Sequence, residues 1–315
     1  MKIEQLRIFL AVAEHLHFTR AADSLYITQP AVSAAIQSLE EQYGVKLFHR
    51  IGRHIELTDA GKLLQIEAQK ILDQVELTAQ GLRELNDLQR GELKIGSSLT
   101  IGNYWLPGKI SRFKQRYPGI SVDCTLANAE DICMGTASGI FDMGLVTGTV
   151  KPIHQKVLTT TPIGSDAVSI VVGQSHPWFE VSTLTPADLS QTLWVMREAG
   201  SGLRQTFEAA LQEWGVNPAD LDLAMVLNSS EMIKAVVEGG IGAAPVPRSM
   251  VRREIQLSTL KAIRVVDTVS RPKRTYQISQ PMLLLKHQKR FQTRIAKEFE
   301  LLLLQEEEDE LQEIA

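Results

Sequence analysis

Residues 18–42, FTRAADSLYITQPAVSAAIQSLEEQ, carry two short apolar repeats separated by a polar turn. Ala22 and Leu25 lie three positions apart, which is the spacing of one helix face. The second repeat has apolar residues at positions i, i+4 and i+7: Val32, Ile36 and Leu39. Between the repeats, Thr28 is a suitable N-cap, and Pro30 is tolerated because amide groups in a first helical turn lack intrahelical partners. The stretch therefore predicts two short helices that cross.

The outward face of the second predicted helix is mostly polar. If the three apolar residues face inward, short side chains occupy the opposite face: Gln29, Ser33, Ala34 and Gln37. Such side chains suit the base edges of double-stranded DNA, whose major groove admits one helix. In this hypothesis the contacts from this segment come from Thr28, Gln29, Pro30, Ser33 and Gln37. The alternative is an ordinary amphipathic helix pair.

The flanking segments complete a small domain. Residues 3–16 place five apolar side chains on one face of a further helix: Leu6, Phe9, Leu10, Ala13 and Leu16. After Gly44, the segment VKLFHRIGRHIELT alternates in two short runs around Gly52, which predicts a β-hairpin. Residues 1–58 hold six Lys and Arg against six Asp and Glu, so attraction to DNA depends on where the charges lie. Four basic or titratable residues gather in the hairpin: His49, Arg50, Arg53 and His54.

Residues 6–61, LRIFLAVAEHLHFTRAADSLYITQPAVSAAIQSLEEQYGVKLFHRIGRHIELTDAG, resemble the helix-turn-helix domain of the LysR-type transcriptional regulators. The resemblance is position-specific and implies a winged helix-turn-helix that binds double-stranded DNA. It also implies that the hairpin lies along the DNA backbone or minor groove. Arg53 is the first candidate for that contact, with Arg50 beside it, because a narrow minor groove attracts arginine; the alternative is a solvated surface arginine. Ala34 departs from the family, in which many members carry a long polar or basic residue.

A single long helix is predicted over residues 59–90. Between Thr58, which can cap the helix, and Gln89 there is no proline and only one glycine after the first turn. Apolar residues alternate by four and three along most of it: Leu64, Ala68, Ile71, Val75, Leu82 and Leu85. About 30 residues give a helix of roughly 45 Å. A seam of this kind favours a partner helix, so we expect a homodimer or homotetramer; the alternative is a helix that lies on the following domain.

Beyond residue 90, strands alternate with helices in two sets, which predicts an open, mainly parallel sheet. The region resembles LysR effector domains, which are themselves similar to periplasmic solute-binding proteins. The resemblance implies that the chain crosses between two lobes near Ile163 and near Val266. The expected fold class is therefore α/β overall, with an N-terminal all-α winged helix-turn-helix, a long linker helix and a two-lobed α/β effector domain. The expected domains are residues 1–58 for DNA binding, 59–90 for the linker helix, 91–163 with 267–315 for the first lobe, and 164–266 for the second lobe.

The C-terminal segment is expected to form a helix that starts near His287. Its last buried turn is expected at residues 301–304, LLLL, and the acidic residues beyond are expected to form a solvated tail. Residues 298–315 carry eight Asp and Glu and no Lys or Arg, so the net charge of −4 leaves +4 on residues 1–297. The overall negative charge therefore does not argue against DNA binding.

Polar residues follow the predicted strands, where ligands bind in open α/β sheets. In the second lobe, Gly200 and Gly202 let the backbone turn tightly before a helix whose N-terminal amides favour anions. Residues 197–204, REAGSGLR, resemble the REPGSGTR-like stretch of LysR members that sense metabolite anions, with Leu203 in place of the usual threonine. We therefore expect a small anionic effector bound by Ser98, Thr100, Asn128, Thr147, Ser201, Gly202 and Arg204. The alternative is a plain strand-to-helix turn whose arginines form surface pairs.

Catalytic and cofactor motifs are absent: there is no GxxxxGK(S/T), HExxH, GxSxG or CxxC. The chain is therefore not expected to be an enzyme or to bind a metal or cofactor. Its two cysteines, Cys124 and Cys133, fit reduced thiols in a cytosol. No apolar signal core follows Met1 and no uninterrupted apolar run reaches 18 residues, so a cytoplasmic protein without a membrane segment is expected. An exported solute-binding protein would need a signal segment, and a metabolic enzyme with a helical appendage would need a catalytic cluster.

Overall fold

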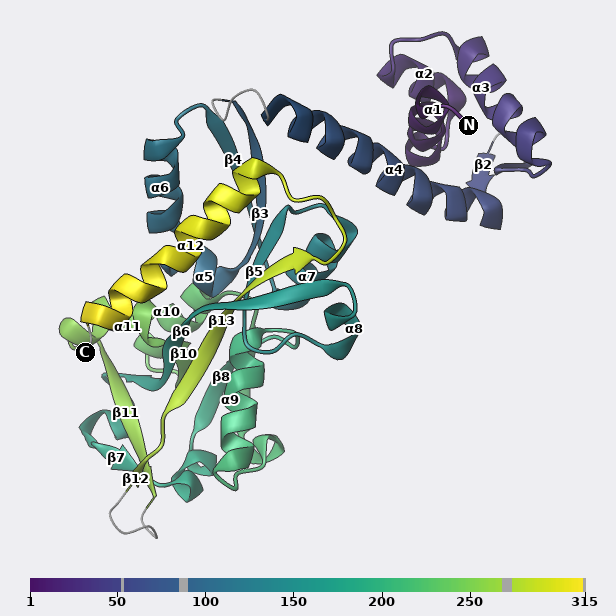
Figure 1. The fold of residues 1–315 in the computed structure, drawn as a ribbon. Coiled ribbons are helices and arrows are strands. Elements are labelled where there is room, and N and C mark those ends of the chain that lie inside the picture. The colour runs from purple at the N-terminus through teal and green to yellow at the C-terminus, as the bar shows by residue number, and fades with distance from the viewer. Residues whose placement is uncertain (52–53, 85–89, 268–273, 314–315) are drawn as a thin grey trace. The chain divides into compact units, whose positions relative to one another are not determined.

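The computed structural model describes residues 1–51, 54–84, 90–267 and 274–313 (Figure 1). The chain forms two compact units, Met1–Asn86 and Asp87–Ala315. The first is helical with a small hairpin, and the second contains a large mixed sheet with helices. The α/β class expected from the sequence is confirmed.

The N-terminal unit packs three helices around one core. The helices are α1 (Ile3–His15), α2 (Phe18–Ser24) and α3 (Gln29–Tyr43), and a hairpin of β1 (Phe48–Ile51) and β2 (His54–Leu57) follows. The core includes the apolar residues that the sequence pattern placed inward on α3: Val32, Ile36 and Leu39. The Phe9 ring of α1 lies against the Phe48 ring of the hairpin, with centroids 5.4 Å apart. The predicted helices and hairpin strands are confirmed.

Leu16 does not join this core, contrary to the sequence pattern. It is 45% exposed, and its backbone is left-handed with φ of 46°, so it forms the C-cap of α1. The left-handed residue turns the chain away from the helix axis before the side chain can reach the core. Val12 and Ala13 are therefore the last core residues of α1.

The long helix α4 (Asp59–Glu84) belongs to the N-terminal unit. Thr58 caps it as predicted, because its Oγ1 accepts a hydrogen bond from the Gly61 amide at 2.9 Å. Leu64 and Ala68, which the sequence assigned to a seam for a partner helix, pack instead against the core of the three-helix domain. Further along the predicted seam, Ile71 is 36% exposed and Leu82 is 62% exposed. Leu85 lies outside the described residues.

In the described part of the C-terminal unit, eleven strands form one mixed sheet. The strands are β3 (Gly91–Ser98), β4 (Ile120–Ala127), β5 (Met143–Thr147), β6 (Leu158–Gly173), β7 (Thr183–Leu184), β8 (Leu193–Arg197), β9 (Asp222–Leu227), β10 (Ala243–Pro247), β11 (Leu260–Asp267), β12 (Arg274–Thr275) and β13 (Ile278–His287). The main order is β4-β3-β5-β13-β6-β10-β8-β9. The outer strands are parallel, as expected, whereas β13 and β6 run antiparallel to each other and to their neighbours.

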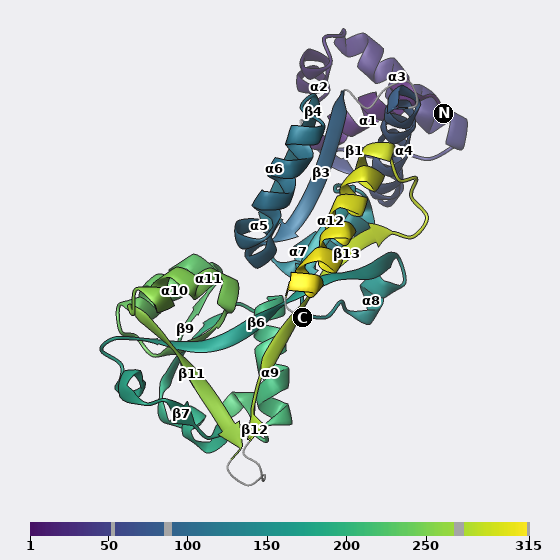
Figure 2. The same ribbon diagram turned by 60° about the vertical axis from the view of Figure 1, so that its left-hand side comes forward.

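Two lobes flank the central pair β6 and β13 (Figure 2). Lobe I contains β3, β4 and β5 with the helices α5 (Leu99–Tyr104), α6 (Leu106–Arg116), α7 (Ala129–Ser138), α8 (Pro152–Gln155) and α12 (Arg294–Glu313). Lobe II contains β7 to β11 with α9 (Gly202–Glu213), α10 (Ser230–Glu238) and α11 (Arg248–Gln256). Each lobe buries its own apolar clusters.

The chain passes between the lobes within β6 and again within β13. In β6, Ile163 belongs to the lobe I core and Val168 to the lobe II core. In β13, Ile278 belongs to lobe II and Met282 to lobe I. The second passage is therefore later than the expected position near Val266, because Val265 of β11 is still buried in the lobe II core.

The C-terminal helix starts at Arg294 and not near His287, because residues 278–287 form strand β13. α12 packs along α6, with the Phe299 ring edge-on to Phe113 at 5.0 Å between centroids (Figure 1). Leu303 is buried as predicted, but Leu301 is half-exposed. The helix continues to Glu313, and the predicted acidic tail falls on side chains outside the described set.

The position of Phe9 at the centre of the N-terminal core gives a stability prediction. Phe9→Ala should lower the unfolding free energy of this unit by about 3–5 kcal/mol, because it removes a buried ring and leaves a cavity. Leu16→Ala, the control on the same helix, should cost less than about 1 kcal/mol because Leu16 lies outside the core. Hydrogen exchange of α1 to α3 amides in the full chain measures both. Equal loss of protection in the two variants would contradict this account of the core.

Candidate functional site

The predicted recognition helix α3 presents its polar face to solvent. Because Val32, Ile36 and Leu39 are buried on the opposite side, Gln29 and Gln37 are exposed and Ser33 is half-buried. The Gln29 Nε2 donates a hydrogen bond to Ser33 Oγ at 2.8 Å, and Gln37 Nε2 donates to Glu41 Oε1 at 2.7 Å. These pairs hold the two amides along the helix surface, and each amide uses one of its donors there.

The entry to α3 differs in one detail from the expected capping. Thr28 occupies the N-cap position and Pro30 the first turn, but the Thr28 side chain accepts no hydrogen bond from the helix. Just before it, Tyr26 is 96% exposed and has a left-handed backbone with φ of 56°. Tyr26 was not predicted as a candidate from the sequence, because it does not fall in the apolar repeats that define the two helices. It lies at the turn through which α2 leads into α3.

The hairpin is only partly described. Its strands pair from Phe48 with Leu57 to Ile51 with His54, and His49 is exposed between them. Arg53 and the side chain of Arg50, both predicted to contact DNA, lie outside the described residues.

On lobe I, the predicted effector residues stand at the ends of strands, as expected from the pattern. Ser98 and Thr147 end β3 and β5, Thr100 lies in the first turn of α5, and all three are buried. The Ser98 Oγ is buried without a hydrogen-bond partner among the described residues. Asn128, in contrast, has a structural role, because its Oδ1 accepts a hydrogen bond from the Asp131 amide at 2.9 Å and caps α7.

On lobe II, the glycine turn before α9 lies against lobe I. A methyl group on Gly202 would come within 1.9 Å of the Thr147 carbonyl oxygen, so only glycine allows this approach. Gly200 has φ of 90°, and a methyl group on it would lie 4.0 Å from the side-chain Nδ2 of Asn128. Ser201 is buried at the N-cap of α9, and its side chain makes no capping hydrogen bond. The structure therefore brings Asn128 and Thr147 together with residues 200–202.

Arg204 is already paired, in contrast to the expected contact with an anion. Its Nε donates to Glu208 Oε1 at 2.6 Å, and its Nη1 donates to the Arg197 carbonyl oxygen at 3.1 Å. Arg197 is buried and binds both carboxylate oxygens of Glu198, with Ser230 Oγ as a further partner at 2.8 Å. Both arginines of the REAGSGLR segment therefore have their charge balanced by a neighbouring carboxylate.

A cavity of 400 Å³ lies beside Thr100 and extends between α5, α6 and α11. None of the other six predicted effector residues lines it. Its charged lining residues were not selected from the sequence: Lys109, Arg112, Asp166 and Arg252. The rule used on the sequence, that ligands bind at strand ends in an α/β sheet, selects no residue of α6 or α11. The two helices are distant in the sequence, and only the tertiary fold places them around one cavity.

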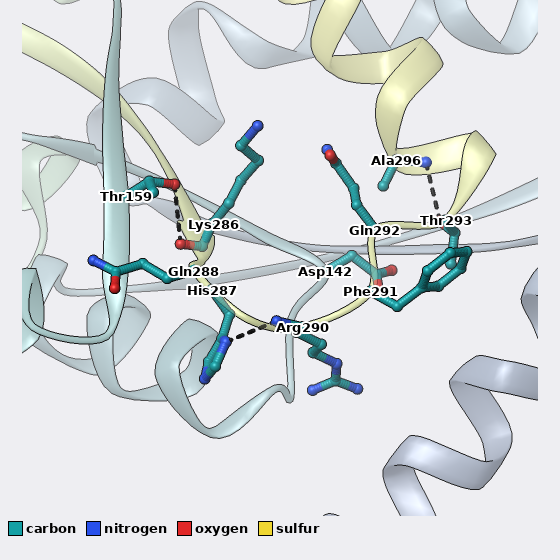
Figure 3. A pocket seen from close by; sticks show the side chains of 10 residues that line it. All are labelled: Asp142, Thr159, Lys286, His287, Gln288, Arg290, Phe291, Gln292, Thr293 and Ala296. Atoms are coloured by element: carbon teal, nitrogen blue, oxygen red, sulfur yellow. Dashed lines mark hydrogen bonds between the residues drawn. The ribbon is translucent and has the colours of Figure 1, made fainter.

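Figure 3 shows a smaller cavity, of 210 Å³, between the end of β13 and the start of α12. His287 Nδ1 accepts a hydrogen bond from the Arg290 amide at 3.1 Å. Burial lowers the pKa of His287, and the nearby Arg290 and Lys289 charges lower it further. Lys286 of the same cavity pairs with Glu300. These groups stabilise the β13–α12 connection within lobe I.

The cysteines show no reactive character. Cys124 and Cys133 are unbonded, and burial raises the pKa of Cys133 to about 11 and also raises that of Cys124. A thiol with a raised pKa holds little thiolate at neutral pH and is a poor nucleophile. Among the residues that the structure describes, no three His, Cys, Asp or Glu side chains gather as a metal site. None of the described helices has the length and apolar character needed to cross a membrane.

Two family models match the chain. The bacterial regulatory helix-turn-helix protein of the lysR family matches residues 3–62. The LysR substrate binding domain matches residues 86–307. The first match contains α1 to α3 and the hairpin, and the second contains both lobes.

Curated relatives match most of the chain in sequence. A probable RuBisCO transcriptional regulator of Cyanidioschyzon merolae is 35% identical over 279 residues, which cover 89% of this chain and 92% of the relative. A protein of the same description from Synechocystis sp. is 35% identical over 258 residues, covering 82% and 75%.

Solved structures show the same fold at lower identity. Full-length CbnR complexed with its target DNA has a TM-score of 0.67 at 23% identity, covering 96% of this chain and 99% of that one. The effector binding domain of QuiR in complex with shikimate has a TM-score of 0.59 at 14% identity, covering 70% and 98%. With both family models, the relatives and the fold in agreement, this chain belongs to the LysR family of DNA-binding transcriptional regulators, which are not enzymes.

Proposed function

We propose that this regulator reads DNA with the polar face of α3 and that a small anionic metabolite, bound between its two lobes, modulates DNA binding or promoter activation. The proposal of DNA reading rests on the orientation of α3. Burial of Val32, Ile36 and Leu39 leaves the Gln29, Ser33 and Gln37 face outward. That arrangement suits a helix in the major groove, with Thr28 and Pro30 at its entry and Arg50 and Arg53 on the wing.

The proposed division of labour follows the sequence boundaries. Residues 1–58 bind DNA, 59–90 link and dimerise, and the two lobes hold the effector. A regulator of this kind acts where the DNA is, so the proposed location is the cytoplasm. The relatives described as probable RuBisCO transcriptional regulators make genes of carbon fixation a class of targets to test.

Oligomerisation is proposed to use the part of α4 that the three-helix domain leaves uncovered. Leu64 and Ala68 are used within the N-terminal unit, whereas Ile71 and Leu82 remain exposed. Exposed apolar side chains at this spacing on a helix are buried best by a second helix, which supports a homodimer or homotetramer.

Two features support the proposed effector site: the N-terminal amides of α9 and the buried hydroxyl of Ser98. The charge of Arg204 supports it less, because Glu208 already pairs with that charge. The N-terminus of the twelve-residue helix α9 offers free amides and the positive end of the helix dipole. On lobe I, the buried Ser98 Oγ at the end of β3 lacks a hydrogen-bond partner among the described residues. Shikimate, bound by the effector domain of QuiR, is a carboxylate, which is the chemistry that such groups favour. Although the Nε of Arg204 pairs with Glu208, its remaining guanidinium N–H groups can still donate.

Sequence reading by α3 is tested with Gln29→Ala. The variant should lose about 1–3 kcal/mol on specific DNA and little on random DNA, because a base-edge contact disappears while phosphate contacts stay. Gln69→Ala is the matched control, since Gln69 also donates to a residue four positions on, Asp73, but lies on α4. Fluorescence anisotropy with specific and random duplexes measures both. If Gln29→Ala kept full discrimination, another face of the domain would read the sequence.

The oligomer interface is tested by placing charge on the seam. Ile71→Asp with Val75→Asp should reduce the assembly to smaller species, because two buried carboxylates would have to be desolvated at the interface. Gln69→Asp with Gln74→Asp adds the same charge on exposed positions of α4 and should leave the mass unchanged. Light scattering gives the mass of each. An unchanged mass for the seam variant would remove the dimerisation role from α4.

The effector site is tested with Ser98→Ala. Since the Ser98 hydroxyl has no hydrogen-bond partner within the described part of the chain, its loss should leave the thermal midpoint nearly unchanged. An anionic effector should bind about 1.5–3 kcal/mol more weakly, the worth of a hydrogen bond to a charged group. A thermal-shift screen of carboxylate and phosphate metabolites identifies the ligand, and calorimetry on the full chain gives the affinities. Ser97→Ala, at a buried neighbour that bonds the Ser98 carbonyl, is the control. Equal affinity of Ser98→Ala and wild type would place the ligand elsewhere.

A further inference from the structure

The 400 Å³ cavity beside Thr100 has walls from both lobes and from the strand that joins them. Lobe I contributes α5 and α6, and lobe II contributes Ser249 and Arg252 of α11. Residues 163–166 of β6 and Met282 of β13 line it at the passage between the lobes. The volume is within the range of small-molecule sites, about 300–1,000 Å³.

The charged lining of this cavity is mainly positive. Three cations, Lys109, Arg112 and Arg252, face one carboxylate, Asp166. Asp166 accepts a hydrogen bond from Ser249, so part of its capacity is used within the wall. Lys109 is only 6% exposed, and its Nζ lies 4.9 Å from the centroid of the Trp105 ring. Arg252 is exposed and has no ion pair with any residue in the described part of the chain. A concave surface of one sign attracts ions of the other sign.

A buried hydroxyl in the same wall lacks a partner. The Tyr104 ring, from α5 of lobe I, packs against the lobe II cluster that contains Val251 and Leu260. Its Oη is buried and has no hydrogen-bond partner among the described residues. A buried hydroxyl usually has a partner, because its desolvation is otherwise uncompensated. An oxygen-rich ligand in the cavity would supply that partner.

The backbone along this wall is irregular where the two lobes join. Gly164 has φ of 130°, a conformation that favours glycine. The pairing of β6 with β13 shifts register between Met282 and Leu283, so Ile163 has no opposite residue. A ligand that touches α6 and α11 together would therefore bind one separation of the lobes better than another.

We propose that this cavity is a second ligand site, for a small polyanion with at least two negative charges close together, as in a diphosphate or a dicarboxylate. Lys109 and Arg112 bind it from lobe I, Arg252 binds it from lobe II, and the Tyr104 hydroxyl donates a hydrogen bond to it. The site goes beyond the proposed function, since it shares only Thr100 with the proposed effector site. Its occupation fixes α6 relative to α11 and so sets the separation of the lobes.

Calorimetry on the full chain with inorganic pyrophosphate and with malonate tests the proposal. At least one of the two should bind, and Arg252→Gln should weaken it by about tenfold or more, because one cation of the site is lost. Arg253→Gln is the matched control: it removes the same charge from the next, exposed position of α11, which does not line the cavity, and should change the affinity by less than about twofold.

Tyr104→Phe tests whether the Tyr104 hydroxyl contacts the ligand or only stabilises the fold. It should weaken binding of the same probe, yet it should leave the thermal midpoint of the free protein unchanged or higher, because the hydroxyl has no partner to lose. Equal affinity of Arg252→Gln and Arg253→Gln would overturn the proposal, as would absence of binding by both probes at millimolar concentration. Loss of probe binding in Ser98→Ala with retention in Arg252→Gln would also overturn it. DNA binding without ligand should persist in all these variants, so failure here leaves the proposed DNA-reading function in place.

Discussion

The antiparallel pairing of β6 with β13 is the interaction on which the C-terminal unit depends. It runs from Val168 opposite Ile278 in lobe II to Leu158 opposite His287 in lobe I, and so ties two separate hydrophobic cores together. The pairing shifts register between Met282 and Leu283, beside Gly164, whose φ is 130°. At the same level, the Gly148 amide donates a hydrogen bond to the Pro281 carbonyl oxygen at 3.0 Å. Both the proposed effector site and the polyanion cavity lie beside this irregularity.

The N-terminal unit is a small domain that buries one face of α3 in its core and leaves the opposite, polar face exposed. Its apolar residues are drawn inward from α1, α2 and α3 and from the hairpin, and α4 adds Leu64 and Ala68 to the same core. The burial of one α3 face fixes which side chains point outward. In the proposed function, specificity for DNA follows from hydrophobic packing behind α3, because a shift of one residue in that packing would turn Gln29 and Gln37 away from the proposed DNA-reading face.

Local patterns predicted much of this fold, and tertiary contacts account for what they missed. Helical spacing identified α3, and the alternation of strands and helices identified the lobes. The predicted start of the C-terminal helix near His287 was wrong, because strand β13 runs to His287 and α12 begins only at Arg294. The Arg204 and Glu208 pair was visible as i, i+4 spacing but was outweighed by the anion-site resemblance. The cavity between α6 and α11 has walls from both lobes, so a local sequence pattern could not predict it.

In the proposed function, this chain recognises a DNA sequence through paired copies of α3. Selection of duplexes from a random pool by the full-length protein, at fixed physiological salt, tests it most directly. Such recognition should enrich a partly palindromic site whose half-sites are separated by whole turns of the double helix, about 10 base pairs or a multiple of that. Recovery of unselected sequences, with binding that only followed the salt concentration, would contradict it.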